Sequence, residues 1–466
     1  MIADLKPYAK YKESKLPWLG QVPGHWDIRP AFGAFVTNHE RNHGMKEKTV
    51  LSLSYGRIVI KPAEKLHGLV PESFETYQIV NPGDIVLRTT DLQNDHTSLR
   101  IGMVRDRGII TSAYLALRVN VGVMPDFGFQ FLNVWDASKA IYGYGSGLRQ
   151  NLDFSHFKRM PVAVPRPAEQ AAIVRFLEWA NGRLERAIRA KRKVIALLNE
   201  QKQAIIHRAV TRGLDPSVPL KPSGIPWLGE SPAHWKWIPI KRLLSRMDYG
   251  TSEASTETGG IRVLTMGNIQ KGEVIMPRSG GLDDLPDSLL LEHHDLLFTR
   301  TNGNPDLVGK VGIFRGQLSD KVSFASYLVR LRVKRPHEPQ WLHMLLNSPA
   351  FWPFARSHAL VNLQTNLNST RYGQFPVLVP TPAEQVRIVE WVTEESKALN
   401  AAIIRLDREI ELLWEYCTRL VADVVTGKLD VREAAARLPD DAAPDTVEET
   451  ADVSDEAERF ADETAA

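Results

Sequence analysis

Two long segments of the chain carry apolar residues in a helical repeat. The first, residues 168–210, contains no proline and only one glycine, Gly182, and is rich in Ala, Glu, Lys, Arg and Leu, a composition typical of a long helix. Pro167 and Glu169 predict where this helix begins, because proline and acidic residues favour a first helical turn. With Val174 at the first position of a heptad, seven of the ten seam positions are apolar. The pattern predicts an apolar stripe that faces a partner helix.

The second segment repeats the first without a gap, since residues 382–430 align with residues 167–215. Eight of its ten seam positions are aliphatic, so we expect the two helices to pack on each other as an antiparallel coiled coil. Such a helix is roughly 60 Å long at about 1.5 Å per residue and would act as a spacer. The polar seam residues Asn181, Lys191 and Lys202 are expected to set the register or to extend to solvent. The seam residues expected at the helix interface are Leu177, Leu184, Ile188, Ile195, Leu198, Leu399, Ile403, Leu406, Ile410 and Leu413.

Residues 1–166 and 215–381 differ from the helical segments, because they mix short β-like runs with turn residues. Each of these regions is predicted to fold as a compact α+β domain. The steps Gly83-Asp84 and His294-Asp295 are predicted as turns that precede a strand. The matched strands are expected at Ile85–Arg88 and Tyr114–Val119 in the first region, and at Asp295–Phe298 and Tyr327–Val333 in the second.

Two sequence motifs occur twice. Leu-Pro-Trp-Leu-Gly at Leu16–Gly20, followed by Pro-Gly-His-Trp at Pro23–Trp26, recurs as Ile-Pro-Trp-Leu-Gly and Pro-Ala-His-Trp, at a constant offset of 209 residues. The segment Pro161–Gln170 recurs as Pro376–Gln385, at an offset of 215 residues. The chain is therefore one long unit written twice, and such a chain can be pseudo-two-fold symmetric and suit a nearly symmetric partner such as a DNA duplex.

The four paired tryptophans of the first motif allow two interpretations. Trp18, Trp26, Trp227 and Trp235 could stack on bases or anchor each domain to the helices. We expect the anchoring role.

The predicted organisation has five parts. Residues 1–166 and 215–381 are the two mixed domains, and residues 167–214 and 382–430 are the two spacer helices. Residues 431–466 are predicted to be an acidic disordered tail, because they are rich in Pro, Ala, Asp and Glu and contain one aromatic residue, Phe460.

The net charge of +3 hides an asymmetry between the tail and the rest of the chain. Residues 440–466 hold eleven acidic residues and one arginine, so they carry −10 and the preceding body carries +13. A basic body suits a polyanionic partner such as nucleic acid. The tail could keep this body soluble or compete with DNA for it.

Catalytic and metal-binding signatures are absent from the sequence. We find no phosphate-binding loop, and the glycine-rich segment Tyr142–Gly147 lacks the dinucleotide-binding spacing. His293-His294-Asp295 has no second ligand cluster and is better explained as a turn. The single cysteine, Cys417, falls on the helix seam and is expected to be a small core residue of a cytoplasmic protein. No apolar run is long enough to span a membrane, and the N-terminus is too polar for a signal peptide.

Polar side chains suited to DNA gather at corresponding places in the two halves. Two stretches, residues 145–152 and 362–369, lie just before the entry to each long helix, and two others, residues 88–91 and 299–304, follow the first matched strand. Arg can bind guanine through two donors, and Gln or Asn can do the same with adenine. The alternative for all four stretches is an ordinary capped loop. The candidate DNA-binding residues are Arg88, Thr89, Thr90, Arg149, Gln150, Asn151, Arg300, Thr301, Asn302, Gln364, Thr365, Asn366 and Asn368.

The duplicated motifs resemble those of the specificity (S) subunits of type I restriction–modification enzymes. The resemblance rests on the Pro-Trp-Leu-Gly-x-x-Pro-x-His-Trp opening of each half and on the Pro-x-Pro-Ala-Glu-Gln entry to each long helix, and it covers nearly everything from Leu16 to Asp430. It implies two target recognition domains, each reading one half of a bipartite, asymmetric DNA target. It also implies two conserved helices that form an antiparallel coiled-coil spacer.

The resemblance further implies a non-catalytic subunit that works with partners. Two modification subunits would bind S-adenosylmethionine and methylate adenine, and restriction subunits would add ATP- and Mg-dependent translocation. This chain itself would bind no cofactor, no metal and no membrane. Two other classes stay open from the residues alone: an enzyme with an unrecognised active site, and a stand-alone coiled-coil interaction or DNA-binding protein.

Overall fold

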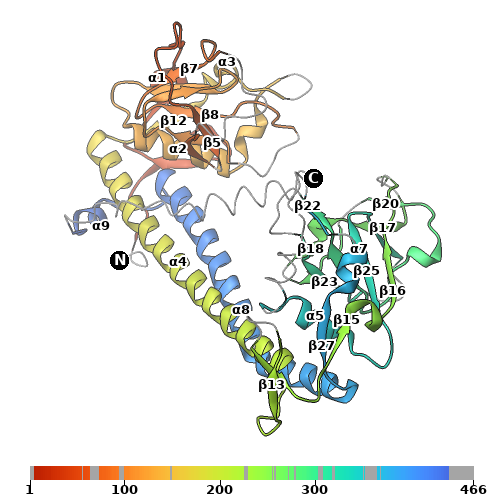
Figure 1. Cartoon of the computed structure of the whole chain (residues 1–466). Helices are drawn as coiled ribbons and strands as arrows, with labels where there is room; N and C mark the ends of the chain where they lie inside the picture. The colour runs from red at the N-terminus through yellow and green to blue at the C-terminus, as the bar shows by residue number, and fades with distance from the viewer. Residues whose placement is uncertain are drawn as a thin grey trace. The chain divides into compact units, whose positions relative to one another are not determined.

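The computed structural model describes residues 5–439 except residues 55, 63–72, 94–98, 147–149, 225–228, 254–255, 257–258, 271, 278–279, 303–307, 317–320, 350, 352–364 and 368. The described residues form two compact units (Figure 1). The first unit holds residues 5–190 and 408–439, and the second holds residues 191–407. Both long helices contribute one part to each unit, so the units divide inside the helices and not at the domain boundaries expected from the sequence.

The named strands of the first unit pair antiparallel in small sheets. The largest sheet has the order β4-β11-β8-β9, with β4 at Phe35–Thr37, β11 at Leu115–Val119, β8 at Ile85–Leu87 and β9 at Ile101–Met103. The other pairs are β1 (Tyr11–Glu13) with β2 (Gln21–Pro23), β3 (Asp27–Pro30) with β12 (Pro161–Val164), β5 (Leu51–Ser54) with β6 (Arg57–Ile60), and β7 (Gln78–Val80) with β10 (Gly108–Ile110). The helical elements between them are α1 (Ala31–Ala34), α2 (Pro125–Ala137), η3 (Ala140–Gly143) and α3 (Phe154–Phe157).

The second unit repeats this plan with additions. Its main sheet has the order β16-β25-β21-β23-β19-β18, with strands at Leu244–Tyr249, Leu328–Val333, Leu296–Thr299, Val311–Ile313, Glu273–Val274 and Ile269–Gln270. A second sheet has the order β20-β17-β24, at Gly281–Leu282, Ile261–Leu264 and Val322–Phe324. The pairs are β13 (Leu220–Pro222) with β14 (Glu230–Pro232), β15 (Lys236–Pro239) with β27 (Pro376–Val379), and β22 (Thr301–Asn302) with β26 (Thr365–Asn366). The helical elements are η4 (Ile240–Leu243), η5 (Met266–Asn268), η6 (Asp287–Leu289), α5 (Pro339–Leu346) and α7 (Ser369–Gln374). Both units therefore combine sheets with helices, which confirms the predicted α+β class.

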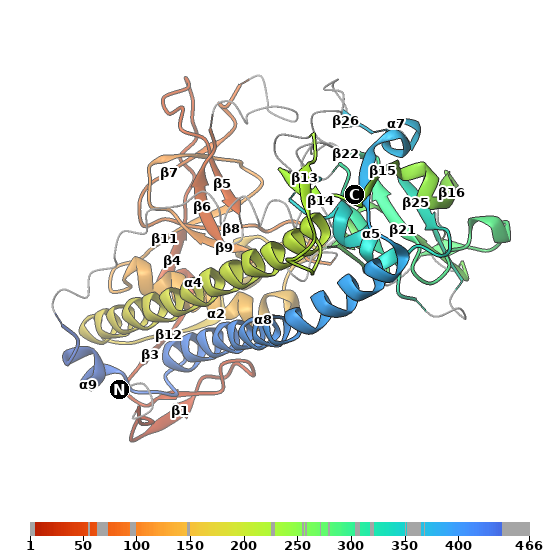
Figure 2. The same ribbon diagram turned by 60° about the horizontal axis from the view of Figure 1, so that its bottom comes forward.

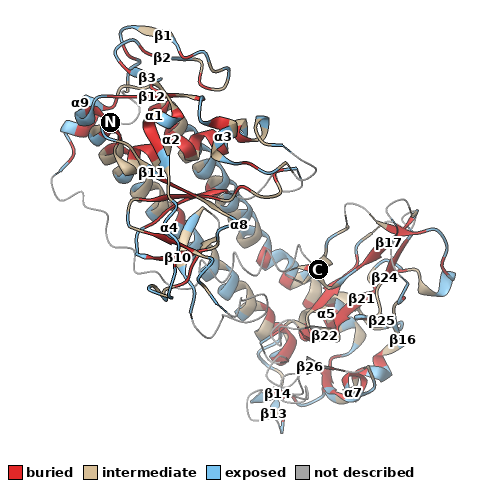
Figure 3. Ribbon diagram, turned by 90° about the horizontal axis from the view of Figure 1, so that it is seen from above, coloured by how far each residue is buried: buried red, intermediate tan, exposed pale blue. Residues whose placement is uncertain are grey.

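The central strand of each unit is buried on both faces (Figure 3). In β8, Ile85 and Leu87 contribute to one apolar core, and Val86 between them contributes to another. In β21, Leu297 likewise packs into a different core from its two neighbours. Alternate side chains of a strand point to opposite faces, so a continuous apolar run can serve two cores at once.

The predicted long helices are α4, at Pro167–Arg212, and α8, at Pro382–Val425. All ten aliphatic residues expected at their interface are buried or half-buried. In the first unit, Phe176 and Leu177 of α4 share a core with Leu420 and Val424 of α8, and these helix parts lie side by side (Figure 2). In the second unit, residues 206–210 near the end of α4 share a core with residues 388–392 near the start of α8. In each unit, therefore, the early part of one long helix lies against the late part of the other.

Two of the polar seam residues, Asn181 and Lys202, are paired across the helices. Lys202 Nζ donates to Asn400 Oδ1 at 2.9 Å in the second unit. Cys417 Sγ donates to Asn181 Oδ1 at 3.2 Å in the first, and burial raises the pKa of the Cys417 thiol. These pairs satisfy polar groups that the seam would otherwise bury without a partner.

The end of the described chain returns to its beginning within the first unit. The Asp430 amide donates to the Lys6 carbonyl at 2.8 Å, and Arg175 Nη2 donates to the Leu438 carbonyl at 3.0 Å. The short helix α9, at Arg432–Ala436, follows Asp430 and buries Ala434 and Ala435 in the apolar core. The disorder predicted from residue 431 onward is therefore wrong for residues 431–438, because their apolar side chains pack into the first unit. In the second unit the matching residue, Asp215, simply continues along the chain toward β13.

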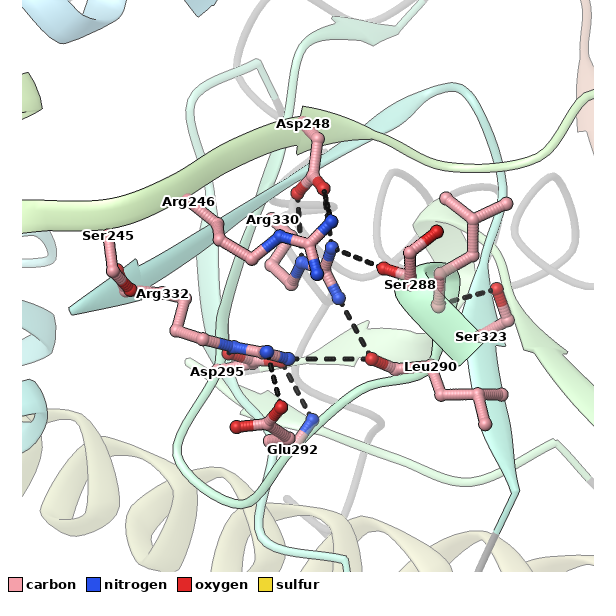
Figure 4. Close-up of polar contacts among 11 residues, drawn as sticks. Ser245, Arg246, Asp248, Ser288, Leu290, Glu292, Asp295, Ser323, Arg330 and Arg332 are labelled. Carbon is pink, nitrogen blue, oxygen red and sulfur yellow. Dashed lines mark hydrogen bonds and ion pairs between the residues drawn. The ribbon is translucent and has the colours of Figure 1, made fainter. Parts of the chain in front are cut away.

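A tight turn and an aspartate precede both central strands, as predicted from the steps Gly83-Asp84 and His294-Asp295. Both Gly83 and His294 have a left-handed backbone, with φ of 91° and 69°. The buried Asp295 carboxylate accepts from the Glu292 amide at 2.7 Å and from Arg332 on β25 at 2.7 Å (Figure 4). Asp84 makes the same two contacts in the first unit, with the Asn81 amide at 2.9 Å and with Arg118 on β11 at 2.9 Å.

We predict that Asp295→Ala will destabilise the second unit by about 3 kcal/mol, because it leaves the partly buried Arg332 guanidinium without its buried partner. Hydrogen exchange of the β21 and β25 amides measures the loss. The matched control is Glu292→Ala, which removes an exposed carboxylate from the same arginine and should cost under about 1 kcal/mol. Equal losses in the two variants would contradict the assignment.

Candidate nucleic-acid interface

Two polar segments that lie far apart in the sequence meet beyond the end of β8 in the first unit. The Leu152 amide donates to the Thr89 carbonyl at 2.8 Å, and the Asp91 amide donates to Asn151 Oδ1 at 3.2 Å. Ser146 and Asn151 close the second segment with a pair of main-chain hydrogen bonds. Residues 88–91 therefore meet Ser146 and residues 150–152, and we call these described residues the first loop pair.

The second unit builds the same edge beyond β21. The Leu367 amide donates to the Arg300 carbonyl at 2.7 Å, which matches the bond between Leu152 and Thr89. Next to this bond, β22 (Thr301–Asn302) pairs with β26 (Thr365–Asn366). Residues 300–302 and 365–367 form the second loop pair. The two stretches that the sequence singled out in each half are thus brought together in both units.

Some of the candidate side chains are engaged by the fold itself. Thr89 is 6% exposed, and its hydroxyl donates to the Ala113 carbonyl at 3.2 Å. The Gln150 amide nitrogen donates to the carbonyls of Tyr142 and Tyr144, at 2.6 and 2.9 Å. These two side chains support the loop pair from within.

The remaining candidates differ in their exposure and in whether their side chains are described. Arg88 and Thr90 are half-buried, and so are Arg300 and Thr301. Asn151 is exposed, although its Oδ1 accepts from Asp91. The backbones of Asn302, Thr365 and Asn366 are described as strand residues, without their side chains. Arg149, Gln364 and Asn368 lie outside the described residues.

Two residues of the first loop pair have a strained backbone. Asp91 and Gln150 are not glycines, yet their φ angles are 59° and 48°. A left-handed conformation at such a residue costs on the order of 1–3 kcal/mol and persists only where its surroundings hold it. The hydrogen bonds at the Asp91 amide and the Gln150 side chain supply part of that support.

Arg300 stands over an aromatic ring in the second loop pair. Its guanidinium carbon lies 5.0 Å from the centre of the Tyr249 ring, within the range of a cation–π contact. The Tyr249 hydroxyl accepts from the Ser369 amide and hydroxyl at 3.2 and 2.8 Å. The neighbouring Tyr327 is 53% exposed. The sequence gives no sign that Tyr249 is a partner of Arg300, because 51 residues separate them and no motif marks the tyrosine.

The two repeated motifs meet at the start of each long helix. In the first unit, the buried Glu169 accepts from Trp26 Nε1 at 2.9 Å and lies 2.7 Å from His25 Nε2. In the second unit, Glu384 lies 2.8 Å from His234 Nε2 and accepts from the Thr381 amide at 2.9 Å. Burial alone would raise the pKa of Glu384, but the Thr381 amide, His234 and the Thr381 hydroxyl together lower it.

The glutamine that follows each glutamate joins the long helix to a helix of the domain. Gln170 Oε1 accepts from the amide of Met124, which caps α2, at 2.7 Å. Gln385 Oε1 accepts from the amide of Glu338, which caps α5, at 2.9 Å. Both glutamines are fully buried, so this contact fixes each domain to the first turn of its own helix.

The anchoring role expected of the tryptophans agrees with this arrangement. Trp26 and Trp235 are buried, and the Trp18 ring makes an edge contact with Phe131 of α2 at 5.7 Å. Trp227 lies outside the described residues.

Among the described residues there is no group of three or more His, Cys, Asp or Glu side chains that could hold a metal ion. In the same part of the chain, no helix combines the length and the apolar character that crossing a membrane requires.

Comparison with known proteins gives one curated relative and several solved structures. The relative is the type I restriction enzyme EcoKI specificity subunit of Escherichia coli (strain K12), which is 23% identical over 276 residues. The match covers 55% of this chain and 56% of the relative, so it spans about half the length of each. No family model matches the chain.

A solved chain from a study of complex assembly and conformational transition of the type I R-M system has the same fold. It superposes with a TM-score of 0.51 at 14% identity, over 87% of this chain and 98% of that one. The HsdS subunit from Thermoanaerobacter tengcongensis gives a TM-score of 0.37 at 13% identity, over 88% of this chain and 98% of its own. This chain resembles type I specificity subunits in sequence and in fold. The resemblance predicted from the duplicated motifs is confirmed.

We predict that Glu169→Ala will destabilise the first unit by about 1–3 kcal/mol, since the buried Trp26 Nε1 loses its acceptor. The exposed His25 also loses its partner carboxylate, which adds little. The matched variant Glu384→Ala should cost about 1 kcal/mol, mainly through the lost helix cap at Thr381. Hydrogen exchange of the β3–β12 and β15–β27 amides reports on each unit separately. A larger loss in the second unit would show that the motif contact does not work as described.

Proposed function

We propose that this chain is the DNA-recognition subunit of a type I restriction–modification complex. Each unit would contact one half of a bipartite, asymmetric duplex target through its loop pair. The proposal rests on the main-chain arrangement that the two loop pairs share, which we call their shared frame. The same main-chain hydrogen bond closes both, while the residue types beside it differ: Thr89 and Gln150 in one, Arg300 and Thr365 in the other.

A shared frame with different side chains suits two different half-sites. Arginine and asparagine can each read a purine through two hydrogen bonds, whereas lysines and arginines on the basic body can hold phosphates. The tail excepted, that body carries a net charge of +13. The domains would be residues 1–166 and 215–381, with the acidic residues 431–466 outside the recognition machinery.

Helices α4 and α8 would form a continuous antiparallel coiled coil that relates the two halves by a pseudo-two-fold axis. The seam residues covered in each unit, from Leu177 to Leu198 and from Leu399 to Leu413, support this spacer. The length of the helices would then set the gap between the two half-sites.

The chain would be non-catalytic and would act in the cytoplasm with partners. Two modification subunits would supply S-adenosylmethionine and methyl transfer, and restriction subunits would supply ATP- and Mg-dependent chemistry. The name of the curated relative, a specificity subunit, supports this division of labour.

The proposal is tested by selecting duplex DNA from a random-sequence library with the purified full-length chain. We expect enrichment of one target with two specified halves and an unspecified gap, and an affinity that falls steeply as salt rises, because phosphate contacts release counterions. Purified chain that transfers methyl groups or cleaves DNA by itself would contradict the non-catalytic role. Binding that ignores both sequence and salt would favour a coiled-coil interaction protein.

The spacer is tested by deleting one heptad from each helix, residues 195–201 and residues 399–405. We predict that the preferred gap shortens by about three base pairs, since seven residues span about 10.5 Å of helix and a base pair about 3.4 Å. The control replaces the exposed Leu197 and Ile404 by glutamine, which keeps both helices at full length and should leave the gap unchanged. An unaltered gap after the deletion would rule out the spacer mechanism.

A further inference from the structure

Arg100 is a fully buried arginine between the two segments of the first loop pair. It lies directly before β9, and its backbone amide donates to Asp136 Oδ2 of α2 at 2.7 Å. Asp136 is fully buried as well. The residue is thereby fixed to the helix that packs under β9.

The Arg100 guanidinium donates to the backbone of residues 88–91. Nη1 donates to the Thr90 carbonyl at 2.9 Å and to the Arg88 carbonyl at 3.4 Å, and Nη2 donates to the Asp91 carbonyl at 3.1 Å. Asp91 is the strained residue of this segment, with φ of 59°. Arg100 therefore holds the backbone of the loop in the conformation that orients Arg88 and Thr90.

The same side chain reaches the second segment through Tyr142. Arg100 Nε donates to the Tyr142 hydroxyl at 3.3 Å, and its guanidinium lies 5.6 Å from the centre of the ring. The Tyr142 carbonyl in turn accepts from the side-chain amide nitrogen, Nε2, of Gln150 at 2.6 Å. One buried cation thus supports both strained positions, Asp91 and Gln150.

Burying a charged side chain costs free energy, because the charge must be removed from water and every donor needs an acceptor. An apolar side chain would fill the position beneath the loop at lower cost. What the guanidinium adds is a fork of donors with fixed directions, which specifies where several carbonyl oxygens lie.

Among the described residues of the second unit, no buried arginine stands at the matching position. The matching strand position is Lys310, whose carbonyl accepts from the Thr299 amide at 3.0 Å, just as the Arg100 carbonyl accepts from the Arg88 amide at 2.8 Å. There, the loop pair is held by the β22–β26 pairing and by the contact of Arg300 with Tyr249.

We infer that Arg100 is the positioning residue of the first loop pair and sets selectivity for one half of the DNA target without touching DNA. The inference rests on the proposed function and deepens it. Because Arg100 has no exposed surface, it acts through the loop backbone and not as a contact residue.

The experiment repeats the selection with the full-length variant Arg100→Lys, which keeps the charge but replaces the fork by a single ammonium group. We expect at least about a tenfold loss of base preference in one half of the selected target, the range of one good bidentate base contact. The other half, and the affinity for a duplex of unrelated sequence, should stay unchanged. A merely structural role would lower all three together.

Two further variants complete the design. Arg300→Ala, in the second loop pair, is expected to weaken preference in the other half of the target. Tyr142→Phe removes only the hydroxyl that accepts from Arg100, and it should give a smaller loss in the same half as Arg100→Lys. It takes the place of Arg100→Lys if circular dichroism shows that variant to be unfolded.

The outcomes separate the inference from the proposed function. If Arg100→Lys changes neither half, changes both halves equally, or changes the same half as Arg300→Ala, the positioning role of Arg100 is wrong and the proposed function stands. If the wild-type chain enriches no two-part target, the proposed function itself fails.

Discussion

A buried glutamine at the start of each long helix is the contact on which the arrangement within each unit depends. Gln170 and Gln385 each accept a hydrogen bond from the residue that caps a domain helix and donate to the proline carbonyl at the entry to their own helix. A buried amide left without these partners would be costly, so only one placement of the domain on its helix satisfies it. The direction in which a loop pair faces, relative to the helix part of its own unit, follows from this contact.

The sequence predicted the elements of the fold better than it predicted the contacts between them. The apolar repeat located α4 and α8, and the steps Gly83-Asp84 and His294-Asp295 were predicted as turns and are turns in the structure. These features are local, because helix composition, heptads and turn residues act over a few positions. The duplication also revealed which stretches correspond, before anything placed them in space.

The contacts that the sequence did not predict are those between distant residues. Glu169 meets Trp26 across 143 positions, and Arg100 lies in an otherwise unremarkable stretch of sequence. No periodicity or motif states that an arginine will be buried beneath a loop, since arginine is usually exposed. The division of both helices between two compact units likewise leaves no mark in composition, because packing between distant residues sets it.

The two units show how one main-chain framework can carry two different loop pairs. The Asp–Arg pair next to the central strand and the main-chain bond that closes the loop pair occur in both units. The contacts that support the loop pair differ. In the first unit the buried Arg100 donates to backbone carbonyls of the loop, and in the second Arg300 packs on the Tyr249 ring. Main-chain hydrogen bonds tolerate a change of side chain, whereas a directional polar support must be rebuilt with each new loop. Divergence in these supporting contacts, on a main-chain framework that both units keep, therefore accounts for two different loop pairs in one chain.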